Sequence, residues 1–409
     1  MKPKLLRIST VPMSLNVLLK GQLKFLNQYF EVTAVSGAGK DLDEVKEREQ
    51  VKIQAVEMQR NISPVKDFIS LIKLYLLFRK EKPEIVHSIT PKAGLLSMIA
   101  GKMAGVPIRM HTFTGLIFPS KTGLMQKLLI AMDRLLCRAA THIYPEGNGV
   151  KNDLINYKIT SKPLKVLANG NVNGIDLEYF NPNQIPESQK QNLKNQLGIK
   201  KDDFVFIFVG RLVGDKGLNE LVTTFSSLTP QLPNPSTPQL PNSPTPQLPN
   251  SSTLKLPNSS TPQLLLVGSL ESELDPLQPQ TLKEIEANPN IISVGFQSDV
   301  RPYFAVSDCL VFPSYREGFP NVVMQAGAMG LPSIVSDING CNEIIVEDEN
   351  GTIIPVKNSE AISEAMQKMM SNKLYYEQLK AKARPMIENR YEQKIVWEAI
   401  LEEYRSILK

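Results

Sequence analysis

Cysteine and histidine are scarce in this chain, and their positions limit the chemistry that they can support. The 409 residues include three cysteines and three histidines. Cys137, Cys309 and Cys341 lie far apart and have neither metal-ligand nor redox spacing. We therefore expect no disulfide framework, and a reduced compartment is the simpler environment for the chain.

Long apolar runs are also absent. No stretch of signal-peptide length follows the basic residues 2–7, and no uncharged stretch is long enough to cross a bilayer. We therefore expect a cytoplasmic protein. No Gly-x-Gly-x-x-Gly motif follows the first apolar run, which makes a dinucleotide-dependent oxidoreductase the least favoured enzyme class.

Positive charge is concentrated in the first half of the chain. Residues 1–177 contain 26 Lys and Arg against 14 Asp and Glu, whereas the remaining residues contain 20 against 27. This asymmetry indicates an anionic partner for the first half, such as lipid headgroups or a phosphate-bearing acceptor. A solvated basic face explains it equally well. No aromatic-basic recognition motif accompanies the charge, so we expect no nucleic-acid partner.

Short apolar runs alternate with helical patterns, and the alternation occurs twice. In the first half we predict strands at residues 5–11, 30–35, 85–89 and 108–112, and helices at 64–78 and 124–137. In the second half we predict strands at residues 204–209, 264–267, 291–294, 309–312 and 333–335. Such alternation is typical of an α/β fold with parallel sheets and helices on both faces.

A linker at residues 176–191, rich in Asn, Pro and Gln, separates the two series. We expect one Rossmann-like domain at 1–177 and a second at 178–385. The C-terminal part reads as two helical stretches with Pro385 between them, and we expect residues 386–409 to pack back on the first domain.

An eight-residue repeat interrupts the second domain at residues 229–263, where Thr-Pro-Gln-Leu-Pro-Asn recurs. Proline at this density removes backbone donors and fixes φ, so neither helix nor sheet is expected. We predict a disordered or polyproline-like insert between a helix at 218–228 and the next strand.

Three loops in the second half carry residues suited to binding an anion. In the first, residues 210–217, glycines let the backbone approach a ligand, a helix follows, and Arg211 and Lys216 add two cations. A diphosphate fits this loop, although an ordinary charged surface turn is the alternative. The order of residues is not that of a Walker loop.

The second loop, at residues 313–326, places Glu317 at the carboxyl edge of the predicted sheet, where ligands bind in such folds. Pro320 is suited to begin a helix, and the backbone amides of Gly318, Phe319 and Asn321 are free to donate to a phosphate. The third loop, at residues 336–343, ends on Glu343 and is a weaker signal on its own.

Taken together, these segments resemble the family 4 retaining glycosyltransferases, which have the GT-B fold of two Rossmann-like domains facing across a cleft. The family has a Gly-Arg pair followed by Lys-Gly, matched here by Arg211 and Lys216. Its Glu-x7-Glu motif is matched by Glu317 through Gln325. Segments 111–116 and 173–180 are similar to further stretches of the family, so the resemblance covers nearly the whole chain outside the repeat.

The resemblance implies roles for these residues. Arg211 and Lys216 would bind the donor diphosphate and stabilise it as a leaving group, and Glu317 would contact hydroxyls of the transferred sugar. The remaining donor-binding candidates are Gly210, Gly318, Phe319, Pro320, Asn321, Gln325 and Glu343. Gln325 stands where the family usually has a glutamate that accepts from the ribose hydroxyls. An amide can still accept one such bond, but the lost charge would change nucleotide affinity or preference.

Four further residues of the first half, three histidines and one glutamate, could have a role in the site. His111 is the candidate for a catalytic hydrogen bond to the sugar, with a satisfied histidine at a strand end as the alternative. Glu146 is a further candidate to line the cleft. His87 and His142 fall in or beside apolar strands, and we expect both to be structural.

The resemblance implies that a hexose or N-acetylhexosamine is transferred from a nucleotide sugar with retention of its anomeric configuration. The expected donor is a UDP-sugar, and no metal or other cofactor is expected. The acceptor would be a growing, polyprenyl-linked cell-surface glycan such as capsule or lipopolysaccharide. The absence of an Asp-x-Asp motif from the cleft segments agrees with metal independence. Basic amphipathic stretches near 66–82 and 121–138 predict peripheral contact with the inner face of the cytoplasmic membrane, although buried core helices explain them nearly as well.

Two other classes of function remain open. A nucleotide-sugar epimerase can share this fold, and it would consume donor without an acceptor. A non-catalytic nucleotide- or glycan-binding homologue is the second, and Gln325 is the residue that favours it. Donor turnover separates both from a transferase.

Overall fold

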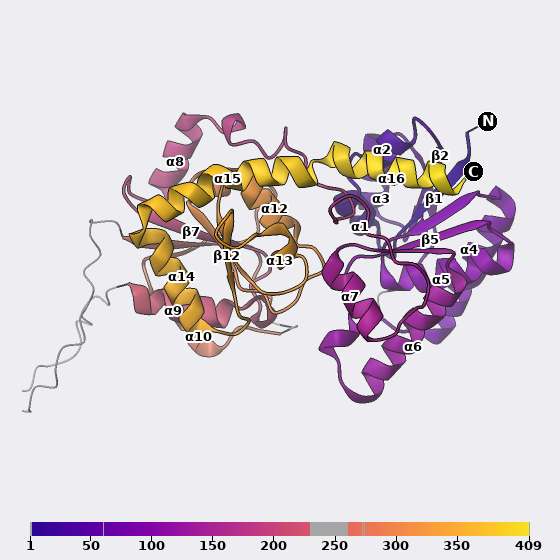
Figure 1. The fold of residues 1–409 in the computed structure, drawn as a ribbon, viewed down its shortest axis with the longest axis horizontal. Coiled ribbons are helices and arrows are strands. Elements are labelled where there is room, and N and C mark those ends of the chain that lie inside the picture. Colours follow the sequence, from indigo (N-terminus) through magenta and orange to yellow (C-terminus); the bar gives the residue numbers. More distant parts are fainter. Residues whose placement is uncertain (1, 60, 230–260, 272, 274, 409) are drawn as a thin grey trace, which may run out of the picture.

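The computed structural model describes residues 2–59, 61–229, 261–271, 273 and 275–408. Two α/β units lie side by side, and a long C-terminal helical segment runs along both (Figure 1). Each unit contains a six-stranded sheet in which every neighbouring pair of strands is parallel.

The first sheet has the strand order β3-β2-β1-β4-β5-β6. Its strands are β1 (Lys4–Ile8), β2 (Glu31–Ser36), β3 (Lys52–Ala55), β4 (Ile85–Ser88), β5 (Ile108–Phe113) and β6 (His142–Pro145). The helices between them are α1 (Pro12–Leu18), α2 (Gln22–Leu26), α3 (Lys40–Glu49), α4 (Pro64–Glu81), α5 (Pro91–Ala104), η1 (Phe118–Ser120), α6 (Gly123–Ala139) and α7 (Asn148–Asn156).

The second sheet repeats this topology in the order β12-β11-β10-β7-β8-β9. Its strands are β7 (Phe204–Val209), β8 (Pro262–Val267), β9 (Ile291–Ser293), β10 (Cys309–Phe312), β11 (Ser333–Ser336) and β12 (Gly351–Ile354). The helices of this unit are η2 (Pro182–Gln184), α8 (Glu187–Leu197), η3 (Gly214–Lys216), α9 (Leu218–Leu228), α10 (Pro279–Ala287), α11 (Arg301–Ala305), α12 (Asn321–Ala328), α13 (Cys341–Ile344), α14 (Ser359–Ser371) and α15 (Lys373–Tyr391). The last helix, α16 (Gln393–Ile407), returns to the first unit.

Central strands have a simple origin in the sequence. β7 and β8 are almost uninterrupted runs of apolar residues, and helices cover both faces of their sheet, so nearly all of their side chains are buried. The α/β prediction is confirmed. In both sheets the order changes direction beside the first strand, which leaves a crevice at the carboxyl ends of the strands.

Two predictions about element ends are wrong. The strand predicted at 5–11 ends at Ile8, because Pro12 already begins α1. The insert predicted at 229–263 extends too far, since Pro262 and Gln263 belong to β8 and pair with β7. Residues 230–260 of the repeat lie outside the described residues.

The expected helix break at Pro385 is also wrong. Pro385 lies inside α15, and the chain turns seven residues later at Glu392, where ψ is 136°. Proline removes a single helical hydrogen bond. The buried side of α15 continues past that point, and its buried residues are Tyr376, Leu379, Ala383, Ile387 and Tyr391. Packing on both sides of the proline therefore holds the helix together.

The chain crosses between the units twice, at neighbouring places. The amide of Ile175 donates to the carbonyl of Tyr391 at 2.7 Å, and the amide of Gln393 donates to the carbonyl of Ile175 at 3.1 Å. Beyond this crossing, α16 lies on the first unit, where Tyr404 is fully buried and accepts a hydrogen bond from Arg7 at 2.8 Å. Within the described residues, no helix combines the length and apolarity needed to span a membrane.

Candidate functional site

A cavity of about 330 Å³ lies where the carboxyl ends of the two sheets face each other. The first unit contributes Pro91 and the loop after β5, and the second contributes the loops after β7 and β10. Its lining residues are Pro91, Thr114, Gly115, Leu116, Ile117, Arg211, Asp215, Lys216, Arg316, Glu317 and Gly318. We call this cavity the donor pocket. It brings Arg211, Lys216 and Glu317 together, as the sequence predicted.

The loop after β7 can reach the pocket because of Gly217. This residue has φ of 72°, and a Cβ atom there would lie 2.1 Å from the carbonyl oxygen of Pro313. Only glycine fits. The tight turn directs Lys216 against the Glu317 carboxylate, with which it forms an ion pair. Arg211 donates to the Glu271 carboxylate at 2.9 Å.

Glu317 is held from two sides. One of its carboxylate oxygens accepts from Lys216 and also from the Ser314 hydroxyl at 2.9 Å. The next residue, Gly318, permits the two units to approach closely, since a Cβ atom there would lie 2.5 Å from the carbonyl oxygen of Thr114. The Glu317 loop is therefore fitted against the loop after β5.

A second cavity, of about 430 Å³, shares Leu116, Asp215, Arg316 and Glu317 with the donor pocket and therefore adjoins it. We call it the side pocket. Its other lining residues are Pro119, Ser120, Asp153, Tyr315, Ile338 and Asn339. Arg316 pairs with Asp215 at 3.1 Å where the two cavities meet.

Arg316 and Asp215 were not singled out from the sequence. Both lie inside the loops that were, so their position beside Glu317 and Lys216 was the available signal. In the same way, Leu116 and Ile117 lie in the loop that begins after the predicted strand at 108–112.

Other predicted donor residues lie elsewhere. Asn321 and Gln325 line a separate cavity of about 370 Å³ beside the chain crossing, together with Ser298. The Asn321 side chain accepts from Asn171 at 3.0 Å. Phe319 is buried, and its ring packs against Tyr391 with 5.5 Å between the ring centroids, so its side chain contributes to packing.

Gly210 and Pro320 hold the backbone of their loops in place. The Gly210 amide already donates to the carbonyl of Val267 at 3.0 Å, so it is not a free donor for a ligand. Pro320 is the residue immediately before α12 and has an extended backbone.

The structure does not place His111 in either pocket. Its side chain is 1% exposed and lines neither pocket. Its Nδ1 atom is 2.8 Å from the Ser88 hydroxyl, and its ring packs edge-on against Phe113. Burial lowers the pKa of His111 to about 3, so the ring is neutral. These contacts agree with the structural alternative, a buried histidine at the end of a strand whose ring is hydrogen-bonded within the first unit.

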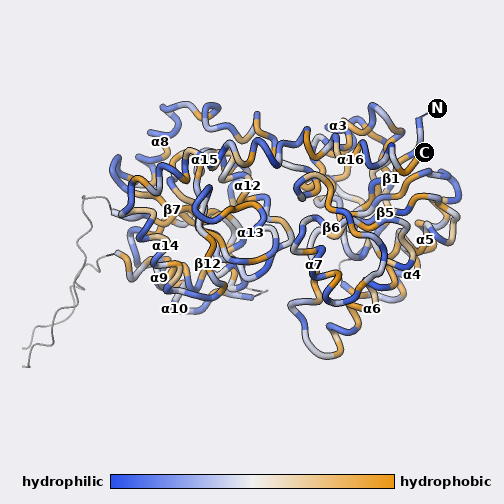
Figure 2. Tube along the Cα trace, viewed as in Figure 1, coloured by the Kyte–Doolittle hydropathy of each residue, from blue (hydrophilic) through white to orange (hydrophobic). Residues whose placement is uncertain are grey.

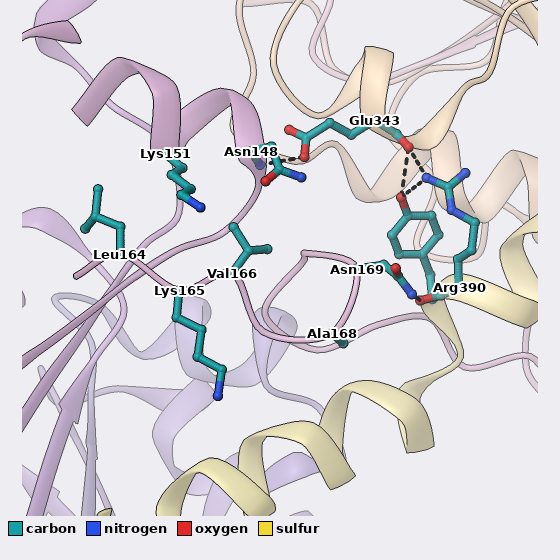
Figure 3. A pocket seen from close by; sticks show the side chains of 10 residues that line it. Asn148, Lys151, Leu164, Lys165, Val166, Ala168, Asn169, Glu343 and Arg390 are labelled. Carbon is teal, nitrogen blue, oxygen red and sulfur yellow. Dashed lines mark hydrogen bonds between the residues drawn. The ribbon is translucent and has the colours of Figure 1, made fainter. Parts of the chain in front are cut away.

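Glu343, a predicted donor-binding residue, does not line the donor pocket. Its carboxylate accepts from the amide of Asn148 at 2.6 Å, at the start of α7 in the first unit (Figure 3). It also accepts from the amide of Gly149 at 3.0 Å. A carboxylate is well placed there, because the first amides of a helix lack partners. Glu343 ties the two units together outside the donor pocket, and it lines a separate cavity of about 510 Å³ beside Lys151 and Arg390.

Glu146 points into the first unit. It is 6% exposed and lines a small cavity with Arg7 and His87. Burial, followed by the nearby carboxylates of Glu343 and Glu317, raises the pKa of Glu146 to about 8. The side chain is therefore largely protonated at neutral pH, and it does not line the donor pocket.

The two remaining histidines have structural environments. His87 is buried, with one ring nitrogen near Arg7 and Tyr404 and the other 2.8 Å from the Thr112 hydroxyl. His142 lies 2.9 Å from the Thr141 hydroxyl. In the described part of the chain, no group of three or more His, Cys, Asp or Glu side chains is arranged to hold a metal ion.

Comparison with known proteins assigns a family. Residues 23–178 match the family described as Glycosyltransferase Family 4, and residues 252–372 match the Glycosyl transferases group 1. A capsular polysaccharide biosynthesis glycosyltransferase, CapM of Staphylococcus aureus, is 31% identical over 99% of this chain and 98% of its own length.

Two further proteins are informative. An Escherichia coli UDP-Gal:alpha-D-GlcNAc-diphosphoundecaprenol alpha-1,3-galactosyltransferase is 29% identical over 77% of this chain and 73% of its own. The crystal structure of Anabaena HepE in complex with UDP superposes with a TM-score of 0.75 at 16% identity, covering 99% of this chain and all of the other. With its two parallel sheets, its facing loops and these relatives, the chain belongs to the family 4 glycosyltransferases and has the GT-B fold.

Proposed function

We propose that the chain transfers a hexose or N-acetylhexosamine from a UDP-sugar, with retention of anomeric configuration, to a growing polyprenyl-linked glycan of the cell surface. The observation that carries this proposal is the meeting of Arg211, Lys216 and Glu317 in one pocket, opposite the loop after β5. The place of action would be the cytoplasmic face of the membrane, with the protein bound peripherally.

The cations of the donor pocket fit a diphosphate. Arg211 and Lys216 each pair with a carboxylate, Glu271 or Glu317, so these positions already stabilise negative charge. A departing nucleoside diphosphate develops its charge at the same place, and preorganised cations lower the barrier to its departure. Glu317, once Lys216 turns to the diphosphate, is free to accept from sugar hydroxyls.

Retention of configuration is supported by the ion pairs that the carboxylates of the donor pocket form. Asp215 and Glu317, the two carboxylates that line the donor pocket, pair with Arg316 and Lys216. Asp215 keeps its Arg316 partner, and Glu317, once released by Lys216, is taken up by the hydroxyls of the donor sugar, so neither is left as a general base for the incoming acceptor. We propose that the departing phosphate takes the acceptor proton, which places the acceptor on the same face of the sugar as the leaving group.

The polyprenyl-linked acceptor and the UDP donor rest on the relatives. The Escherichia coli relative has UDP-Gal and a diphosphoundecaprenol-linked sugar in its name, and the HepE structure contains UDP. The side pocket, which adjoins the donor pocket through Arg316, offers room for an acceptor next to the transferred sugar.

Nucleotide release from a panel of UDP-, GDP- and dTDP-sugars, with and without a membrane lipid extract, tests the proposal. We expect release from a UDP-sugar that requires the extract and is lost in Glu317→Ala. Release without any acceptor would favour an epimerase or hydrolase. Tight nucleotide binding with no release from any donor would favour the non-catalytic homologue and direct attention to Gln325.

Two further measurements test metal independence and retention of configuration. We expect transfer to continue in excess EDTA, since Arg211 and Lys216 supply the positive charge that a metal would otherwise provide. Proton NMR of the product should show the anomeric configuration of the donor. A product of opposite configuration would refute retention while leaving transferase activity established.

A further inference from the structure

The helices α4 and α6 each have two apolar sides, although packing against the sheet requires only one. On α4, the buried side consists of Leu74 and Phe78, with Ser70 one turn before them. A second side, at spacings of four, three and four residues, is exposed and consists of Val65, Ile69, Ile72 and Leu76. On α6, the corresponding exposed side consists of Leu124, Leu128, Ala131 and Leu135.

Exposed apolar side chains gather on this part of the molecule. Among the described residues, twenty-one large apolar side chains are exposed, and eleven of them fall within residues 62–76 and 117–135. The most exposed of these is Leu124, at 85%, and Phe68 is 63% exposed. Single exposed apolar residues are common, but such a concentration in two short segments marks an interaction surface.

The two helices flank α5, whose outward residues Leu95 and Ile99 are only half-buried. Figure 2 shows hydrophobic and hydrophilic residues interspersed along α4 and α6 at the outer part of the first unit. We define the docking face as the exposed apolar residues of α4 and α6, Phe68 included, together with Leu95, Ile99 and the exposed residues of the segment 117–125.

The docking face is also basic. Residues 64–82 and 121–138 contain nine Lys and Arg against three Asp and Glu. Of these acids, Asp67 is paired with Lys92 at 2.7 Å, and burial raises the pKa of Asp133 to about 7. A second copy of the chain would place one basic face against another, whereas an anionic lipid surface is complementary in charge and accepts the apolar side chains.

The docking face adjoins the side pocket. Leu116, Pro119 and Ser120 line that pocket, and the same segment continues through Lys121 to Leu124 at the start of α6. We propose that this face docks on an anionic lipid bilayer and inserts Leu124 and its neighbours between the headgroups. Resting on the proposed function, this docking would bring a lipid-linked acceptor into the side pocket from the membrane plane.

Flotation of the purified full-length protein with vesicles tests the docking without donor or acceptor. The vesicles are phosphatidylcholine alone, or equal parts of phosphatidylcholine and phosphatidylglycerol. We expect flotation with the anionic vesicles, weakened by high salt. Phe68→Asp and Leu124→Asp should each lower the partition coefficient by about tenfold, the loss expected when one large apolar side chain no longer inserts. Leu374→Asp, on α15, should not change it, although the exposure of Leu374, at 71%, lies between those of Phe68 and Leu124.

Three outcomes would overturn the inference. These are no flotation with anionic vesicles at low salt, equal flotation of all variants, and a dimer in sedimentation that Leu124→Asp dissociates. The last would show that the face pairs copies of the chain. Nucleotide release with a short-chain, water-soluble acceptor should be the same in wild type and Leu124→Asp. Failure of the proposed function would abolish that release in both proteins and leave the flotation result standing.

Discussion

At the scale of single residues, the site separates into positions that the sequence could place and positions that it could not. Arg211, Lys216 and Glu317 lie in loops that directly follow strands, so strand prediction alone brought them to one sheet edge. His111 and Glu343 lie outside the donor pocket. The direction of a strand side chain and the partner of a carboxylate across a domain interface depend on tertiary packing, which a local pattern does not contain.

His111 leads to a prediction about Gly94 on α5. A Cβ atom at Gly94 would lie 2.4 Å from the His111 ring and 2.7 Å from Leu136. Gly94→Ala should therefore lower the free energy of unfolding by roughly 1 to 3 kcal/mol through overpacking, although alanine is the better helix former by about 1 kcal/mol. Urea unfolding is the measurement.

The matched control is Gly101→Ala on the same helix, where the nearest atom belongs to the more flexible Arg109 side chain, at 3.1 Å. This substitution should lower the free energy of unfolding by less. Equal effects would show that the pocket around His111 is not tight.

Glu146 gives a prediction about pH. Its pKa in the folded protein is about 8, against an ordinary value of 4.5, so the folded state holds a proton that the unfolded state releases between these values. The free energy of unfolding should therefore fall as pH rises through this window. One pKa unit corresponds to about 1.4 kcal/mol, so the loss is on the order of a few kcal/mol. Glu146→Gln should remove the loss. We expect its stability advantage over wild type, measured by urea unfolding, to be larger at about pH 9 than at about pH 5; a constant difference would contradict a buried, protonated carboxyl.

At the scale of elements, the sequence predicted the central strands better than the edges. β7 and β10 are buried on both faces and appear as apolar runs. The edge strands β3 and β12 were missed, because β3 is largely exposed and the two middle residues of β12 are only half-buried, so neither stands out as a buried apolar run. For α15, the prediction failed because it relied on a local signal. Pro385 predicted a break, but the packing of α15 on both sides of this residue keeps the helix continuous.

The docking of α16 on the first unit is predicted to depend on a buried cation. Arg7 is 1% exposed, bonds to Tyr404 and His87, and has no partner for its Nε atom. Tyr404→Phe leaves the guanidinium with one acceptor fewer, at a cost of about 1.5 to 3 kcal/mol. The only tryptophan, Trp397, lies on α16 and reports the change through its fluorescence in urea. The exposed Tyr29→Phe should leave the midpoint unchanged, and an equal midpoint for Tyr404→Phe would show that α16 docks by apolar contacts alone.

At the scale of the whole molecule, two copies of one strand order face each other and are joined at one crossing. The repeated alternation of apolar runs predicted two parallel sheets. It could not predict the contacts between the units, where Glu343 binds the start of α7 and Asn339 donates to Asp153 at 2.7 Å. These contacts hold the second unit close to the first, so the donor pocket is bounded by loops of both units.

The central claim is that the donor pocket is where the sugar is released from its diphosphate. The most direct test is kcat for sugar transfer by Lys216→Ala, compared with Lys201→Ala, which removes an exposed lysine before β7. Loss of a cation at the departing diphosphate should lower kcat by on the order of a hundredfold or more, with Lys201→Ala unchanged. If Lys216→Ala transferred sugar as fast as wild type, the diphosphate would have to leave from another site, and the account of this pocket would be wrong.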